Sequence, residues 1–224
     1  MNRPQLLPGS ACPLLLCLLL LSWLGGCAPK YHVAVDSLRS DQADKAGPVY
    51  EARPGVTGMA DDDLTLQAVV TQIEPCFAAR GYTLKQAGEA DGKDSNLVFI
   101  SFGISEPDVR IYTTVSYVPH TWGRGRFRHT YWVREEDTWT KVFYHAGLLL
   151  EGCTRTADGK RGKNLWRTEV RCTGQDPDFR TLLQAMLPVL QEHLGKDSSG
   201  QHYYLVTLDD EEPPVVEEKE VTTH

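Results

Sequence analysis

The stretch TKVFYHAGLLLE, residues 140–151, decides the expected fold because its centre is apolar on both faces. An apolar run of this length predicts a strand in the middle of a sheet. Further strands are expected where large apolar residues alternate with others, over residues 96–104, 110–118, 127–133 and 164–172. We expect turns at 134–137 and 154–163, and such short connections favour antiparallel pairing.

Two amphipathic helices are expected beside these strands. The first follows the acidic run Asp61–Asp63, carries apolar residues at helical spacing over 66–77, and stops at Gly81. The second has Pro177 in its first turn and an apolar stripe over 179–194. A proline inside each helix predicts a kink or a break, at Pro75 and Pro188.

These elements together predict one α+β domain over residues 31–208. Shorter strand patterns occur at 31–35, 82–86 and 203–208, whereas 36–61 is expected to be a long irregular connection. We expect an antiparallel (mixed) sheet of about five to six strands, with two helices packed on one face. Residues 209–224 are acidic and contain two adjacent prolines, so we expect a disordered tail.

The composition limits the class of partner. The chain has 224 residues and a formal net charge of −7, with 41% hydrophobic residues. That length suits a single domain with tails. An acidic chain is poorly suited to nucleic acid, so no nucleic-acid partner is expected.

The amino-terminal segment predicts export and a lipid anchor. Residues 11–24 are uncharged, and residues 24–27 read Leu-Gly-Gly-Cys. This resembles the lipobox of a bacterial lipoprotein signal peptide, which implies cleavage after residue 26, lipid on the sulfur of Cys27, and a short linker over 27–30. The alternatives are an ordinary secretory signal and a membrane span, but a span needs about 20 apolar residues. The resemblance implies a lipid-anchored envelope protein, and Ala28 favours the outer membrane facing the periplasm.

The rest of the chain resembles the bacterial envelope lipoproteins grouped as domain of unknown function 4136. The resemblance rests on the lipobox, the strand that follows it, Arg80-Gly81-Tyr82 at a helix end, Leu165-Trp166-Arg167 on a strand, and the helix carrying Leu182 to Pro188. It spans roughly residues 27–195 and departs in the long 36–61 segment and in the extra cysteines. It implies a fold and a location, and it supplies no catalytic residues.

Three cysteines remain in the domain after Cys27: Cys76, Cys153 and Cys172. An oxidising envelope makes one disulfide plausible, and we favour a bridge that involves Cys172. The cysteines and histidines lack the spacing of a zinc site, so neither a metal nor a cofactor is expected.

The segment WGRGRFRHTYWVR, residues 122–134, is the candidate binding site. Arg124, Arg126 and Arg128 are two residues apart and would share one face of a strand, with aromatic surface from Trp122 and Trp132 beside them. Guanidinium groups suit phosphate and carboxylate. The segment therefore predicts a strip for an anionic envelope polymer or a partner protein. The alternative is a solvated strand face beside a mobile glycine-rich loop.

Catalytic patterns are weak. His120, His129 and His145 would form a metal or hydrolytic site only by converging with carboxylates such as Glu106 and Asp108, and no nucleophile elbow is present. The leading hypothesis is a non-enzymatic envelope lipoprotein that acts as a binding or assembly module for another envelope component. The alternatives are a hydrolase acting on an envelope substrate and a purely structural lipoprotein.

Overall fold

The computed structural model describes residues 28–89, 95–209 and 213–219. Its strands are β1 (Lys30–Arg39), β2 (Val49–Pro54), β3 (Thr83–Lys85), β4 (Asn96–Ile104), β5 (Asp108–Trp122), β6 (His129–Arg155), β7 (Arg161–Gly174), β8 (His202–Thr207) and β9 (Val215–Lys219). Its helices are α2 (Leu64–Ala79) and α3 (Phe179–His193), with short 3₁₀ turns η1 (Ala43–Lys45) and η2 (Gly125–Phe127). Cys27 and the expected signal segment 1–26 lie outside the described residues.

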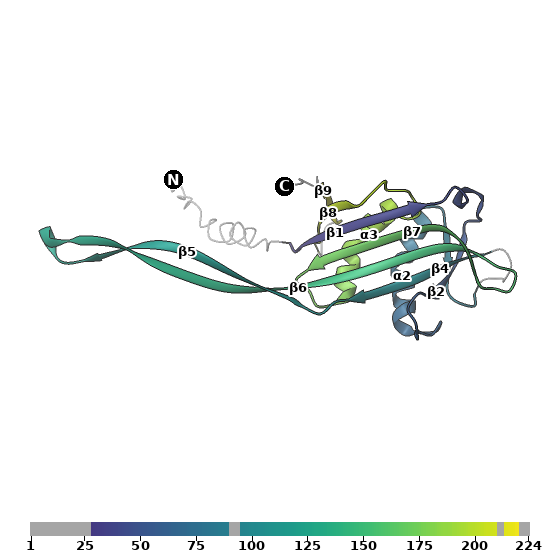
Figure 1. Cartoon of the computed structure of the whole chain (residues 1–224), viewed down its shortest axis with the longest axis horizontal. Helices are drawn as coiled ribbons and strands as arrows, with labels where there is room; N and C mark the ends of the chain where they lie inside the picture. The colour runs from purple at the N-terminus through teal and green to yellow at the C-terminus, as the bar shows by residue number, and fades with distance from the viewer. Residues whose placement is uncertain (1–27, 90–94, 210–212, 220–224) are drawn as a thin grey trace, which may run out of the picture.

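A mixed sheet forms the body of the molecule, in the order β3-β2-β4-β6-β7-β1-β8-β9. Strand β2 pairs in parallel with β3 and β4, and every other pair is antiparallel. Helices α2 and α3 lie side by side on one face of this sheet (Figure 1). No helix covers the other face in the described ranges, and the α+β arrangement is therefore the expected one.

The expected strand number is wrong, because the described sheet has nine strands rather than five to six: the eight in this order and β5, which pairs with β6. Strand β2 lies inside the 36–61 segment that was expected to be irregular, and β9 lies inside the expected disordered tail. Strand β2 was missed because buried Glu51 and terminal Pro54 break its apolar pattern. Strand β9 is acidic and exposed along its length, and it forms by hydrogen bonding to the open edge of β8.

The helices were predicted well. Asp63 caps α2 by accepting hydrogen bonds from the backbone N–H groups of Thr65 and Leu66, and Gly81 follows it with a positive φ of 75°. Helix α3 begins one residue after Asp178, so Pro177 precedes the helix instead of lying in its first turn. Both helices continue through their internal prolines as single elements.

One hydrophobic core fills the space between the helices and the sheet. Alternate residues of β1, namely Tyr31, Val33 and Val35, point into it, as do buried residues of both helices. Trp166 of β7 lies at its centre and donates its indole N–H to the hydroxyl of Tyr50 at 2.9 Å. Within the part of the chain that the structure describes, no helix has the length and apolar character needed to cross a bilayer.

Candidate functional site

A long two-stranded arm projects from one end of the body (Figure 1). It consists of β5 and the first half of β6, paired without interruption from Asp108 opposite Phe143 to Trp122 opposite His129. At roughly 3.3 Å per residue, the 15 residues of β5 span about 50 Å. Strand β6 then continues into the body, where it lies between β4 and β7.

The arm forms from two strand-like segments of equal length joined by a glycine-rich turn. Gly123 and Gly125 take positive φ angles of 106° and 61°, and a Cβ atom at Gly123 would overlap the carbonyl oxygen of Phe127. Near the base, the rings of Tyr112 and Trp139 stack with centroids 4.5 Å apart. Cross-strand contacts of this kind stabilise a ribbon that has no third strand.

Many large apolar side chains on the arm are exposed. They include Val109, Ile111, Val115, Tyr117, Trp122, Phe127, Tyr131, Trp132 and Trp139. An isolated two-stranded ribbon is only marginally stable in water, and a cluster of exposed apolar side chains commonly marks a surface that contacts another molecule. The arm is therefore the candidate functional site.

The five residues of the predicted binding strip lie at the tip of the arm. Trp122 ends β5, Trp132 lies early in β6, and the three arginines lie in or beside η2: Arg124 before it, Arg126 within it and Arg128 after it. The expected strand face is wrong, because glycines at 123 and 125 turn the chain here. The prediction that these residues are neighbours holds, because the turn gathers all three arginines at one end of the ribbon.

The tip carries positive charge that nothing nearby neutralises. No acidic residue occurs between Pro119 and Val133, although the whole chain has a net charge of −7. Among the described residues, none of the three tip arginines has an ion-pair partner. By contrast, Arg110 pairs with Asp108 at 2.8 Å lower on the arm. The tip thus offers free guanidinium groups beside the exposed rings of Trp122 and Trp132.

The histidines and carboxylates considered for catalysis do not all come together. His120 and His129 lie near the tip, whereas His145 lies at the base, where its Nε2 is 3.8 Å from an oxygen of Asp108. The structure therefore brings His145 and Asp108 together at the base and leaves His120 and His129 at the other end of the arm. Within the described residues, no group of three or more potential ligands could hold a metal ion.

The expected disulfide does not form. Cys76, Cys153 and Cys172 are all free and buried. Cys172 is opposite Ala146 on β6, seven residues along the strand from Cys153, which is about 23 Å and far beyond bonding reach. Burial raises the pKa of the Cys76 thiol to about 11 and that of Cys172 to about 12. These thiols are protonated at neutral pH and pack as small apolar groups.

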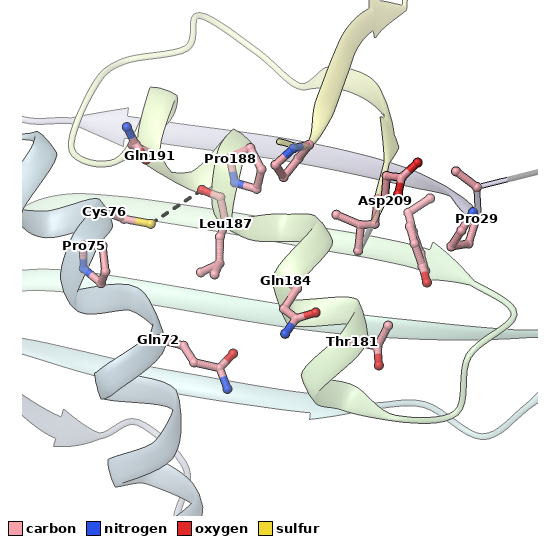
Figure 2. Close-up of a pocket in the computed structure, with 14 residues that line it drawn as sticks. Pro29, Gln72, Pro75, Cys76, Thr181, Gln184, Leu187, Pro188, Gln191 and Asp209 are labelled. Carbon is pink, nitrogen blue, oxygen red and sulfur yellow. Dashed lines mark hydrogen bonds between the residues drawn. The ribbon is translucent and has the colours of Figure 1, made fainter. Parts of the chain in front are cut away.

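A groove of about 790 Å³ lies between α2, α3 and the ends of β1 and β8 (Figure 2). Helix α2 contributes Gln72, Pro75 and Cys76, and the Cys76 thiol donates to the carbonyl oxygen of Leu187 on α3 at 3.5 Å. Its described lining contains no Lys, Arg or His, and its cysteine is protonated. Asp209 supplies a carboxylate to this lining.

Sequence reasoning missed the length of the arm, and with it the exposed residues Ile111, Tyr117 and Phe127. It expected a turn at 134–137 because Arg134, Glu135, Glu136 and Asp137 are consecutive charged residues, but these residues lie mid-strand in β6. The sequence did contain one sign of the long hairpin, namely the equal length of the segments on either side of its turn. Strand-like patterns of equal length flank Gly123–Gly125, as the two legs of one long hairpin require.

Comparisons with known proteins add little. No protein-family model matches the chain, and no curated protein matches it. Among solved structures, a PDZ domain protein from Parabacteroides distasonis ATCC 8503 aligns at 9% identity with a TM-score of 0.38. The alignment covers 86% of this chain and 42% of that chain, so this chain spans less than half of the length of that protein. A likeness at this level carries no argument about fold or function.

Proposed function

We propose that the protein is a lipid-anchored, non-enzymatic envelope module that uses its arm to bind an anionic envelope polymer. The observation that carries the proposal is the tip, where Arg124, Arg126 and Arg128 have no ion-pair partner in the described residues and stand beside exposed tryptophans. Guanidinium groups bind phosphate and carboxylate, and the flat rings of tryptophan stack on sugars. Lipopolysaccharide, teichoic acid and peptidoglycan combine these two chemistries.

The proposed anchor fits the direction of the arm. Strand β1 begins at Lys30, at the same end of the body from which the arm leaves (Figure 1). Lipid on Cys27 would hold the base of the arm near the bilayer, since only two residues separate Cys27 from β1. An arm of about 50 Å would then carry the tip well beyond the headgroups or along the membrane surface.

The anchor is tested separately from the arm. We expect mass spectrometry of the amino-terminal peptide to detect a diacylglyceryl group on Cys27, and we expect Cys27→Ser to release the chain from the membrane fraction. An unmodified Cys27 in membrane-bound protein would refute the lipid anchor. That result would leave the polymer-binding proposal standing.

The polymer proposal is tested with a variant that replaces Arg124, Arg126 and Arg128 by Gln. Each exposed charge contributes about 0.5 kcal/mol, so the loss of three should weaken binding by about 1.5 kcal/mol, or roughly tenfold. The assay is sedimentation with lipopolysaccharide micelles, with teichoic acid-bearing walls or with bare peptidoglycan, at low and high salt. Binding of the unaltered chain should fall as salt screens the charges.

The matched control replaces three other arm cations, Arg110, Arg134 and Lys141, by Gln. Arg110 and Arg134 are already ion-paired, and Lys141 lies over the ring of Trp139 at 5.0 Å. We expect this variant to bind almost as tightly as the unaltered chain. Equal binding by the tip variant and the unaltered chain would overturn the proposal. So would an unaltered chain that binds none of the three polymers.

A further inference from the structure

A hollow of about 760 Å³ lies on the face of the sheet that the helices leave open. It extends over β6, β7, β1 and β8, and no helical residue lines it. Strand register places Gly147, Arg171, Ala34, Tyr203 and Lys219 in one row across the sheet. Their chain neighbours Ala146, Val33 and Val35 are buried in the core, so this row faces away from the helices.

The hollow is formed where small residues on the open face of the sheet leave the backbone uncovered. Gly147 is paired with Gly103 on β4, and Ala34 lies two strands away on the same row. A Cβ atom built on Gly147 or on Gly103 would meet nothing within 4 Å, and neither glycine has a positive φ. Neither packing nor backbone conformation therefore requires glycine at these two positions.

Glycine in the interior of a strand weakens the sheet, and it often marks a place where a ligand approaches the backbone closely. Gly147 lines the hollow and Gly103 lies opposite it near the end of β4, and both weaken the sheet without a packing or conformational reason for glycine. On the same strand, position 152 does require glycine, because a Cβ atom there would overlap the ring of Trp166. The pair Gly103 and Gly147 thus indicates that the space above the backbone is used.

The charge of the rim indicates what would occupy it. Arg171 and Lys219 border the hollow together with His32, His145 and the half-exposed ring of Tyr203, and none of its lining residues is a carboxylate. Arg171 contacts Glu169 through Nε at 2.6 Å and through Nη2 at 2.5 Å, which leaves the Nη1 donors for a further acceptor. The ammonium group of Lys219 lies 3.5 Å from Glu217. His145 is bonded through Nδ1 to the hydroxyl of Thr173 at 2.8 Å, which holds its ring at the rim.

We propose that this hollow binds a small organic anion, with its apolar body over Gly147 and Ala34 and its acid group between Arg171 and Lys219. The apolar body would gain contact with the bare backbone and with the ring of Tyr203. The acid group would accept charge-assisted hydrogen bonds. This site is separate from the tip of the arm and does not depend on the anchor or on polymer binding.

The test uses the anionic aromatic probe 1-anilinonaphthalene-8-sulfonate and follows its fluorescence in a titration of the folded chain. Gly147→Leu should place a side chain on the floor and weaken binding at least tenfold. Because the space above Gly147 is empty, the same variant should unfold at the same urea concentration as the unaltered chain or at a higher one. Weaker binding in a protein of undiminished stability separates a blocked site from a damaged fold.

Arg171→Gln tests the acid-binding group, and Arg167→Gln is its matched control. Both arginines lie on β7 and pair with Glu169, but only Arg171 borders the hollow. We expect about tenfold weaker binding for Arg171→Gln and unchanged binding for Arg167→Gln. The arm-tip variant should bind the probe as the unaltered chain does.

Two results would overturn the proposal. One is unchanged probe binding in Gly147→Leu, which would place the dye elsewhere, for example in the groove between the helices. The other is an equal effect of Arg167→Gln and Arg171→Gln, which would show that only the net charge matters.

Discussion

Gly152→Ala should destabilise the fold strongly although it adds one methyl group. The new Cβ would lie 2.7 Å from Cζ2 of Trp166 and closer still to Cε2 and Nε1 of the same ring. The ring cannot move aside, because it is 2% exposed and packs against Tyr50 and Phe77 at centroid distances of 5.5 and 6.0 Å. Real Cβ contacts do not occur at such separations, so the ring or the strand must shift.

The expected cost follows from two contributions. Overpacking a tight core costs about 1–3 kcal/mol. A displaced indole also loses its hydrogen bond to the hydroxyl of Tyr50, which is worth about 1 kcal/mol. We therefore expect the free energy of unfolding to fall by about 3 kcal/mol, measured by equilibrium urea denaturation with an unchanged slope.

The control lies on the same strand. Gly147→Ala adds the same methyl group above open space, so it should leave the stability unchanged or raise it by about 0.5 kcal/mol. A loss below about 1 kcal/mol for Gly152→Ala, or similar losses for both variants, would refute the reasoning. Either result would mean that the Trp166 ring has room that the structure does not give it.

Three further predictions concern buried polar groups. Glu51→Gln should cost about 3 kcal/mol of stability, since Glu51 is 1% exposed and pairs with two arginines, whereas Glu151→Gln at a half-exposed pair should cost under about 1 kcal/mol; equal losses would contradict this. Burial lowers the pKa of His193 below its usual 6.5, so the unfolded state binds this proton more readily and stability should fall as the pH drops below about 6.5. His193→Gln should remove that part of the slope, and an unaltered pH profile would reject the assignment. Cys76 and Cys172 should stay unmodified by Ellman's reagent at pH 8 until urea unfolds the chain, and rapid labelling of the folded chain would show that they are accessible.

The sequence predicted individual helices and strands better than it predicted which segments form one continuous strand. Caps and spacing located both helices, and alternation located β1, β4 and β7, because these signals depend on residues close together in the chain. Strand β2 was missed because its buried Glu51 is stabilised by arginines at positions 53 and 155, and the second of these contacts is long-range. The arm was divided at 134–137 because consecutive charges are typical of turns, and only a strand exposed on both faces tolerates them.

The candidate binding residues lie together at the tip of the arm, but not for the geometric reason that their spacing suggested. Spacing of two residues predicted a shared strand face, but glycines at 123 and 125 make a turn. The hollow on the open face could not be predicted, since its five-residue row comes from four strands and a tail strand that alternation did not reveal. Its one local signal was Gly147 inside an otherwise bulky apolar run.

Strand β6 is a single element of 27 residues that serves both the arm and the centre of the sheet. The arm and the body are therefore joined by one continuous strand, and no hinge loop interrupts β6 between them. A pull on the tip would load β6 lengthwise against its neighbours β4 and β7. In that shearing geometry many backbone hydrogen bonds resist together instead of opening one at a time. Tension applied at the tip would therefore be carried directly into a strand that lies inside the sheet, between β4 and β7.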